Sequence, residues 1–291
     1  MATTTTALPD EVMSLVRQRS KGGLLQAVSD TALVCGRNLR KLVRTPGLIV
    51  FGTIQPVMML LLFSFVFGGV AGSTIPFYKS FIVPTVVVQS LTFAASSSGV
   101  GLANDLESGM IDRFRSLPIN RAAVLLGRTL SDGVRIFLQA SLLLIVATFI
   151  GFRFPAGVDR GLLMLVVAVI FGVSLSIFMA WMGLWLKDPE TVQVAAFVPI
   201  FPLIFASSGF APVNTLPGWM QEFARVNPFT AAVDTMRGLA LGNHYQRLAN
   251  RPGENFNFSA HLGSSSWHLA AWIAAITLVF TTLSVREYRK V

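Results

Sequence analysis

The sequence is short of charge and of cysteine. Asp, Glu, Lys and Arg make up only 13% of the 291 residues, whereas 53% are hydrophobic. A soluble globular domain carries about 25% charged residues. The single cysteine, Cys35, excludes a disulfide bond within the chain. These shortages argue against a soluble domain and against a small disulfide-stabilised one, and they favour a chain that lies in lipid.

The motifs of catalysis and nucleotide binding are absent. No Gly-x-x-x-x-Gly-Lys-Ser/Thr loop, His-Glu-x-x-His helix or Gly-x-Ser-x-Gly turn occurs. The three histidines, His244, His261 and His268, lack the spacing of metal ligands. We therefore expect no catalytic residue, no metal and no cofactor in this chain.

Ionisable residues are also scarce within the apolar segments. Asp132 lies between Arg128 and Arg135 and is expected to pair with both. A proton-coupled carrier usually has ionisable groups deeper in its helices. The scarcity favours transport whose energy is supplied by another protein.

Apolar residues gather into six runs, each near the length of about 20 residues that carries a helix across roughly 30 Å of hydrocarbon. The runs cover about 48–68, 81–103, 122–152, 162–186, 192–209 and 267–285. The fifth contains Pro199 and Pro202, which a membrane helix tolerates. We predict an all-α membrane protein in which residues 46–291 form one domain with six transmembrane helices.

The positions of Lys and Arg predict the orientation. An even number of spans places both termini on one side, and that side collects most of the basic residues. Short cytoplasmic loops retain positive charge, so we expect cytoplasmic termini in the cell membrane. The net charge of +9 then reflects topology and contact with membrane lipids, and not nucleic acid. Residues 1–20, rich in threonine and charge, are expected to be a flexible cytoplasmic tail and not a cleaved signal peptide.

Residues 21–45 have the pattern of an amphipathic helix. One sector holds apolar residues and the opposite face holds cations. The apolar set is Leu24, Val28, Ala32, Cys35, Leu39 and Leu42, and the basic set is Arg37, Arg40, Lys41 and Arg44. This predicts an interfacial helix; the alternative is a helix that merely flanks the membrane.

The loop of residues 104–121 joins the second and third runs. A helix from Asn104 would align Leu106, Met110, Phe114 and Leu117 on one side, and Pro118 disfavours its continuation. A short amphipathic helix on the cytoplasmic side suggests a surface that docks a partner. The alternative is a solvated connector.

The external region 210–245 is too apolar for a plain loop. Asn227-Pro228 is predicted to open a short helix that ends near Gly242-Asn243. Asp234 and Arg237, three residues apart, can pair on one face of it. We interpret this helix as a partly inserted external element that caps a pathway; the alternative is a surface helix on the outer leaflet.

Two motifs carry a family resemblance. The first is Glu107-Ser108-Gly109-Met110-Ile111-Asp112-Arg113-Phe114 followed by Leu117-Pro118. The second runs from Gly209-Phe210-Ala211-Pro212 through Leu216-Pro217-Gly218-Trp219-Met220 to Asn227-Pro228-Phe229-Thr230, Asp234 and Arg237-Gly238. Together they make the chain resemble, over nearly its whole length, the permease subunits of bacterial ABC-2 type exporters, in particular the daunorubicin-resistance permeases of actinobacteria.

The resemblance implies a six-helix type V exporter fold. It also implies a second permease copy, identical or related, and two copies of a soluble P-loop ATPase that binds ATP and Mg. Residues 21–45 would be the connecting helix, with Arg37, Arg40, Lys41 and Arg44. The implied coupling residues are Glu107, Ser108, Gly109, Met110, Arg113, Phe114, Leu117 and Pro118. The implied external re-entrant helices include Pro217, Trp219, Asn227, Pro228, Asp234 and Arg237.

An exporter of this kind would move an amphiphilic drug, lipid or glycolipid out of the cytoplasm or the inner leaflet. Its path would run between the first, second and fifth spans of two copies. Candidate contacts are Phe63, Phe67, Gln89, Phe93, Phe201 and Phe205, which are otherwise packing or lipid-facing residues. An ATPase-independent secondary transporter or channel is the alternative function. An intramembrane enzyme would need a nucleophile and a base, and no such constellation occurs.

Overall fold

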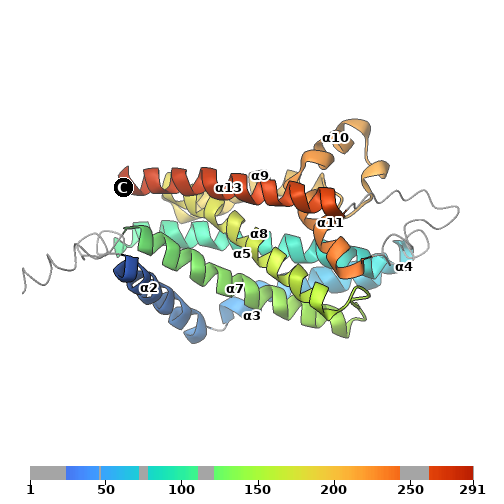
Figure 1. Cartoon of the computed structure of the whole chain (residues 1–291), viewed down its shortest axis with the longest axis horizontal. Coiled ribbons are helices and arrows are strands. Elements are labelled where there is room, and N and C mark those ends of the chain that lie inside the picture. The colour runs from blue at the N-terminus through green and yellow to red at the C-terminus, as the bar shows by residue number, and fades with distance from the viewer. Residues whose placement is uncertain (1–23, 46, 72–77, 111–120, 243–261, 291) are drawn as a thin grey trace, which may run out of the picture.

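The structure is a computed structural model that describes residues 24–45, 47–71, 78–110, 121–242 and 262–290. These residues form an elongated bundle of helices, and no strand occurs among them (Figure 1). The predicted all-α fold class is therefore confirmed. The predicted tail, residues 1–20, lies outside the described residues.

Four described helices are long and apolar enough to cross a membrane. They are α5 (Tyr78–Glu107), α7 (Arg121–Phe149), α8 (Val158–Leu186) and α13 (Leu262–Lys290). They correspond to the second, third, fourth and sixth predicted spans. The third helix begins at Arg121, which agrees with the expected start near residue 122.

The other two predicted spans correspond to shorter apolar helices. The first run forms α3 (Gly47–Leu61), which continues through a π-helical segment, η1 (Leu62–Phe67), into α4 (Gly68–Ala71). The fifth run forms α9 (Pro189–Phe205), which begins at an Asp188 cap and contains both predicted prolines. Six membrane crossings therefore stay a prediction.

The remaining helices lie at the two ends of the bundle. Helix α2 (Leu24–Arg44) lies at the end where α5 finishes and α7 begins, on the left in Figure 1. We call this the basic end, because α2, the start of α7 and the last turns of α13 are rich in arginine. The opposite end, called the α11 end, carries η2 (Val213–Thr215), α10 (Gly218–Val226) and α11 (Pro228–Leu241).

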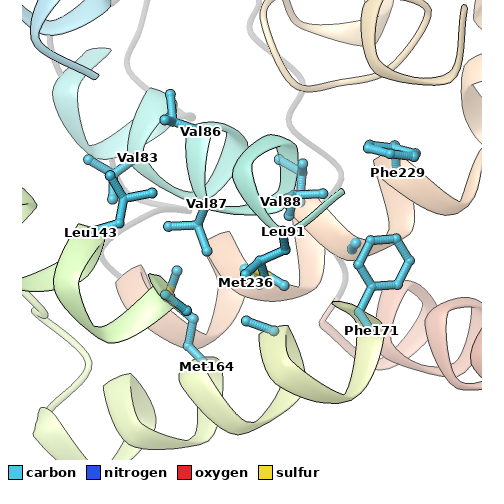
Figure 2. Packing of buried hydrophobic residues seen from close by; sticks show 14 of the residues in the cluster. Val83, Val86, Val87, Val88, Leu91, Leu143, Met164, Phe171, Phe229 and Met236 are labelled. Atoms are coloured by element: carbon cyan, nitrogen blue, oxygen red, sulfur yellow. The ribbon is translucent and has the colours of Figure 1, made fainter. Parts of the chain in front are cut away.

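Helix α5 is the centre of the core. Every residue from Phe81 to Thr92 is buried, because α3, α7, α8, α9 and α11 all contact this helix. Such a position favours a mostly apolar helix, and the buried Ser90 and Thr92 hydroxyls donate to carbonyls of α5 itself. Figure 2 shows Val87 and Leu91 of α5 among Met164 of α8 and Met236 of α11.

Two glycines allow α5 and α8 to touch. A Cβ atom on Gly99 would collide with the backbone carbonyl of Met179, and one on Gly183 would collide with that of Gly99. Small residues at a crossing permit this close approach of helix backbones, which is how helices pack in lipid. The contact fixes the central pair of the bundle and thereby positions both ends.

Candidate functional site

Helix α11 begins at a capped turn tied to α9. The Asn227 side-chain oxygen accepts a hydrogen bond from the Phe229 backbone N–H at 2.9 Å, and its amide nitrogen donates to the carbonyls of Leu203 and Ala206. Pro228 occupies the first helical turn, where its missing N–H costs nothing. The predicted helix start is confirmed, and the same cap satisfies carbonyls at the end of α9.

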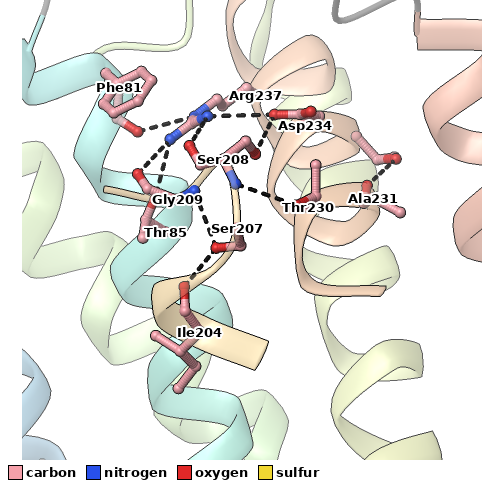
Figure 3. A network of polar contacts seen from close by, with 11 residues as sticks. Phe81, Thr85, Ile204, Ser207, Ser208, Gly209, Thr230, Ala231, Asp234 and Arg237 are labelled. Atoms are coloured by element: carbon pink, nitrogen blue, oxygen red, sulfur yellow. Dashed lines mark hydrogen bonds and ion pairs between the residues drawn. The ribbon is translucent and has the colours of Figure 1, made fainter. Parts of the chain in front are cut away.

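Arg237 lies at the centre of a closed polar network at the α11 end. Its side chain is 0% exposed and donates to the carbonyls of Phe81, Ser208 and Gly209 at 3.1, 2.8 and 2.7 Å. It also donates to the Thr85 hydroxyl at 3.0 Å. Its guanidinium carbon lies 3.6 Å from the centre of the Phe81 ring. Figure 3 shows that these groups converge from α5, the segment after α9, and α11.

The predicted pair of Asp234 and Arg237 is confirmed, with 3.3 Å between the Asp234 Oδ1 atom and an Arg237 nitrogen. Asp234 also accepts from the Ser208 hydroxyl at 2.8 Å. Every residue of α11 except Asp234 is buried, which does not fit a helix lying on a surface. The charge of Arg237 is thus neutralised inside the protein.

Helix α10 differs from α11 in its exposure. Trp219, Phe223 and Val226 are exposed on it, and Pro217 precedes its first turn. The Trp272 indole of α13 donates to the Val226 carbonyl at 2.9 Å, which holds the end of α10 against the bundle. Trp219 and Pro217, expected in an external re-entrant element, therefore lie at its surface and outside the Arg237 network.

A second arginine cluster joins α5 and α7 near the basic end. Arg128 pairs with Asp105 at 2.6 Å and also donates to the Ser98 carbonyl. Arg135 pairs with Asp132 at 3.2 Å, and Asp132 accepts from the Ser98 hydroxyl. The predicted pairing of Asp132 is correct for Arg135 and wrong for Arg128. Arg128 lies opposite the last turns of α5, where Asp105 offers a nearer carboxylate.

Helix α2 is docked on α7 through a glycine. A Cβ atom on Gly127 would lie 2.7 Å from the Thr31 carbonyl oxygen and 2.8 Å from the Val34 Cβ, so only glycine admits this contact. The Asn38 amide donates to the Ser131 hydroxyl at 3.2 Å. Helix α2, which the resemblance leads us to expect as the connecting helix, is therefore attached directly to a long helix of the bundle.

The predicted apolar stripe of α2 lies partly against the bundle and partly at its surface, so its place in the membrane interface stays a prediction. Cys35 is buried, Val28 is 66% exposed and Ala32 is exposed, whereas Val34, outside the stripe, is buried. The contact with α7 rotates the buried face away from the centre of the stripe and leaves the rest of it at the surface. The basic side chains of Arg37, Arg40 and Arg44 are exposed, and nothing is described of the Lys41 side chain.

The expected coupling loop begins with a break in the helix. Helix α5 ends at Glu107, and Gly109 adopts a left-handed φ of +66° that a continuous helix excludes. The predicted single helix from Asn104 to Leu117 is therefore wrong, because Ser108-Gly109 forms a turn within it. Glu107 and Ser108 are exposed. Arg113, Phe114, Leu117 and Pro118 lie outside the described residues.

A cavity of about 690 Å³ opens among α2, α5, α7 and α9 at the basic end. Arg37, Arg128 and Arg135 line it, together with Asp105 and Asp132. Met110, the first residue after the Gly109 turn, and Phe197 of α9 also line it. The cavity thus brings the start of the expected coupling loop beside α2, a proximity that the sequence pattern did not predict.

The family of ABC-2 type transporters matches residues 30–241 of the sequence. The match includes both motifs and all helices from α3 to α11. The chain belongs to the ABC-2 type transporter family.

Three relatives of this ABC-2 chain are named permeases. It is 29% identical over 238 residues to the daunorubicin resistance ABC transporter permease protein DrrB1 of Streptomyces coeruleorubidus, covering 82% of this chain and 84% of that protein. It is 26% identical over 216 residues to the probable doxorubicin resistance ABC transporter permease protein DrrC of Mycobacterium tuberculosis, covering 74% and 78%. It is 26% identical over 212 residues to the putative transport permease ycf38 of Cyanophora paradoxa, covering 68% and 70%.

These matches confirm the predicted resemblance to ABC-2 permeases. They also confirm that the chain is a permease subunit and not itself an enzyme, because the relatives are named permease proteins. Its family and its long apolar helices make it a multi-pass membrane protein. Membership of the family implies association with an ABC ATPase subunit.

Five of the six residues expected along the path of this ABC-2 permease belong to one connected set of phenylalanines. Ring centres lie 5 to 6 Å apart along the series Phe93, Phe197, Phe201, Phe205, Phe210, Phe63 and Phe67. Phe197 and Phe210 were not predicted as contacts of the path. For Phe197, its spacing of four residues from Phe201, which is itself four residues before Phe205, was a visible signal. Gln89, one helical turn before Phe93 on α5, is buried, and its side-chain oxygen has no hydrogen-bond partner among the described residues.

Proposed function

We propose that this chain is the transmembrane subunit of an ATP-driven exporter that moves an amphiphilic drug, lipid or glycolipid out of the cytoplasm or inner leaflet. Two copies of a separate P-loop ATPase, which bind ATP and Mg, would supply the energy. A second permease copy, identical or related, would complete the path. The family and the drug-resistance names of two relatives support this substrate class.

The observation that carries the proposal is the ion pair of Asp105 and Arg128. It joins the last turn of α5, just before the exposed Glu107 and Ser108, to the part of α7 on which α2 docks. A partner that pushes on the loop after Glu107 would therefore displace α5, α7 and α2 together. Such a linkage is what an ATPase docked at the basic end requires, because closure around ATP must be converted into movement of long helices.

Six crossings complete the proposed topology. Helix α3, η1 and α4 run without interruption from Gly47 to Ala71, enough at 1.5 Å per residue to cross about 30 Å. Helix α9 is shorter, and the turn capped by Asn227 would return the chain into the membrane as the re-entrant helix α11. The basic end would face the cytoplasm, together with both termini, and the α11 end would face outward.

The coupling proposal is tested in the complex reconstituted with its ATPase in liposomes. Glu107→Ala and Met110→Ala should each lower transport-linked ATP hydrolysis several-fold while the permease still purifies as a folded subunit. Glu190→Ala, which removes an exposed carboxylate in the first turn of α9, is the matched control and should leave the rate unchanged. Full ATPase rates in both test variants would reject the assigned coupling site.

The topology is tested by labelling single cysteines in intact cells. In a Cys35→Ser background, Asn214→Cys at the α11 end should react with a membrane-impermeant maleimide. Ser108→Cys should react only after the cells are permeabilised. If Ser108→Cys is labelled from outside, a cytoplasmic ATPase cannot reach this loop and the proposed function falls.

A further inference from the structure

The cavity at the basic end has the size of a ligand site. Its volume of about 690 Å³ lies within the range of about 300–1,000 Å³ that small-molecule sites occupy. Its walls come from four separate helices, so it is a feature of the assembled bundle. Ser96, Ser97 and Gln193 add neutral hydrogen-bonding groups to its charged lining.

The charges of the lining favour an anion. Three guanidiniums, from Arg37, Arg128 and Arg135, face two carboxylates. Both carboxylates are already engaged, Asp105 by Arg128 and Asp132 by Arg135 and the Ser98 hydroxyl. Among the described lining residues, guanidiniums therefore outnumber carboxylates by one, and both of these carboxylates are already paired with cations.

The arginines also retain unused donors. The Nε atoms of Arg128 and Arg135 are buried and have no hydrogen-bond partner among the described residues. Buried donors in native proteins are nearly always satisfied, by protein, by water or by a ligand. The guanidinium group presents its N–H donors as a planar fork that matches the oxygens of phosphate and carboxylate. Because these Nε atoms are themselves enclosed, an anion in the cavity would meet the exposed part of the two guanidiniums, whose side chains are 16% and 22% exposed.

An apolar stripe begins at the edge of this charged cavity. Phe197 lines the cavity and continues into Phe201 and Phe205 on the same face of α9, with ring centres 5.6 and 5.8 Å apart. The three residues are 37%, 44% and 56% exposed. Eight residues of helix extend the stripe over about 12 Å along the bundle. A charged cavity joined to an apolar stripe matches the charged headgroup and the apolar tail of an amphiphile.

We propose that the cavity binds the anionic headgroup of an amphiphile while its apolar tail lies along Phe197, Phe201 and Phe205. The inference rests on the proposed export function and narrows its substrate to anionic amphiphiles. Arg128 and Arg135 donate to the headgroup oxygens, and Asp105 and Asp132 hold the two guanidiniums in place. Since Met110 and Asp105 also line the cavity, the occupied site adjoins the expected coupling loop.

The proposal is tested by isothermal titration of the purified full-length permease in detergent, without ATP. The probes are dioctanoyl phosphatidic acid, dioctanoyl phosphatidylcholine and inorganic phosphate. Phosphatidic acid should bind at least about tenfold more tightly than either of the others, a difference that titration resolves readily. Equal affinity for the two lipids would overturn the anionic site. Equal affinity for phosphate and phosphatidic acid would overturn the role of the phenylalanine stripe.

Matched variants test whether phosphatidic acid binds in the cavity. Arg135→Gln removes a cavity cation, and Gln193→Glu adds a negative charge to the cavity without removing any ion pair. Each should weaken phosphatidic acid binding about tenfold. Lys187→Asn makes the same net change in charge as Gln193→Glu at an exposed position outside the cavity, where asparagine tolerates the left-handed backbone. It should leave the affinity unchanged, and an equal loss in all three variants would show attraction by net charge alone and overturn the site.

The exporter function and the headgroup site can be rejected independently of each other. Binding is measured without the ATPase, so a failure of coupling leaves the lipid titration unaffected. A permease that supports ATP-driven transport but does not distinguish phosphatidic acid from phosphatidylcholine overturns only the headgroup site. A permease that binds phosphatidic acid but never stimulates an ATPase overturns only the exporter function.

Discussion

Two arginine clusters lie at opposite ends of this ABC-2 permease and differ in their completeness. At the α11 end, Arg237 is fully enclosed and donates to carbonyls, a hydroxyl and a carboxylate. Near the basic end, Arg128 and Arg135 are partly exposed beside a cavity, and their Nε atoms have no hydrogen-bond partner in the part of the chain that the structure describes. The same side chain is used for two purposes. A closed network holds helices in one arrangement, whereas an open one retains capacity for a ligand and for movement.

Removing the enclosed charge of Arg237 should have the largest effect on stability. Arg237→Met should lower the free energy of unfolding by about 3–5 kcal/mol, because the partly buried Asp234 carboxylate would lose its cation and three buried carbonyls would lose their donor. The measurement is thermal unfolding in detergent followed by size-exclusion chromatography. Arg225→Met, which breaks the exposed pair with Glu222, is the control and should change stability by less than about 1 kcal/mol. Similar stabilities of the two variants would contradict the assigned role of the network.

Forcing α2 away from α7 is expected to have the next largest effect. Gly127→Leu places a side chain where the Thr31 carbonyl and Val34 lie, and overpacking of this kind costs about 1–3 kcal/mol. Hydrogen exchange should show faster exchange confined to α2 and the start of α7. Gly36→Ala, at a glycine of α2 with open space around its Cβ position, should be neutral or slightly stabilising. Unchanged exchange in Gly127→Leu would mean that α2 is not held there.

Breaking the arginine cluster near the basic end should change the free energy of unfolding little but should weaken the coupling to ATP hydrolysis strongly. Asp105→Ala removes the partner of Arg128, a partly exposed pair worth about 1 kcal/mol or less. Transport-linked ATP hydrolysis in the reconstituted complex should nevertheless fall several-fold. A double-mutant cycle with Arg128→Ala isolates the pair, and additive effects on ATP hydrolysis would refute the proposed linkage.

The smallest effect is expected at Asp188, which caps α9 near the basic end. Hydrogen bonds from the Thr191 side chain and backbone N–H lower the pKa of Asp188 below its ordinary value of 3.8. Because the folded-state pKa is lowered, the stabilisation is present above the unfolded-state pKa and is lost as pH falls through the folded-state pKa. Asp188→Ala should therefore lower Tm slightly at neutral pH and not at all in strong acid. Asp188→Asn, which caps without titrating, should show no such pH dependence of its Tm.

Local pattern predicted the helices well. The apolar runs located α5, α7, α8 and α13, and Asn227-Pro228 located the start of α11, because these features depend on neighbouring residues along one helix. The pair of Asp234 and Arg237 was predictable for the same reason, since residues three apart share a face. The pairing of Asp132 with Arg128 failed because Arg128 had a competing carboxylate on another helix.

Sequence alone thus determined an all-helical membrane permease of the ABC-2 family, with a capped helix and an ion pair after its fifth apolar run. Only the tertiary structure decided that Arg237 reaches the Phe81 carbonyl, that Asp105 takes Arg128, and that four helices enclose a cavity leading to Phe197. Periodicity reports which side chains share one helix face. The choice of partner on another helix depends on how closely the backbones approach, and glycines such as Gly99 and Gly127 set that distance only once the bundle is assembled.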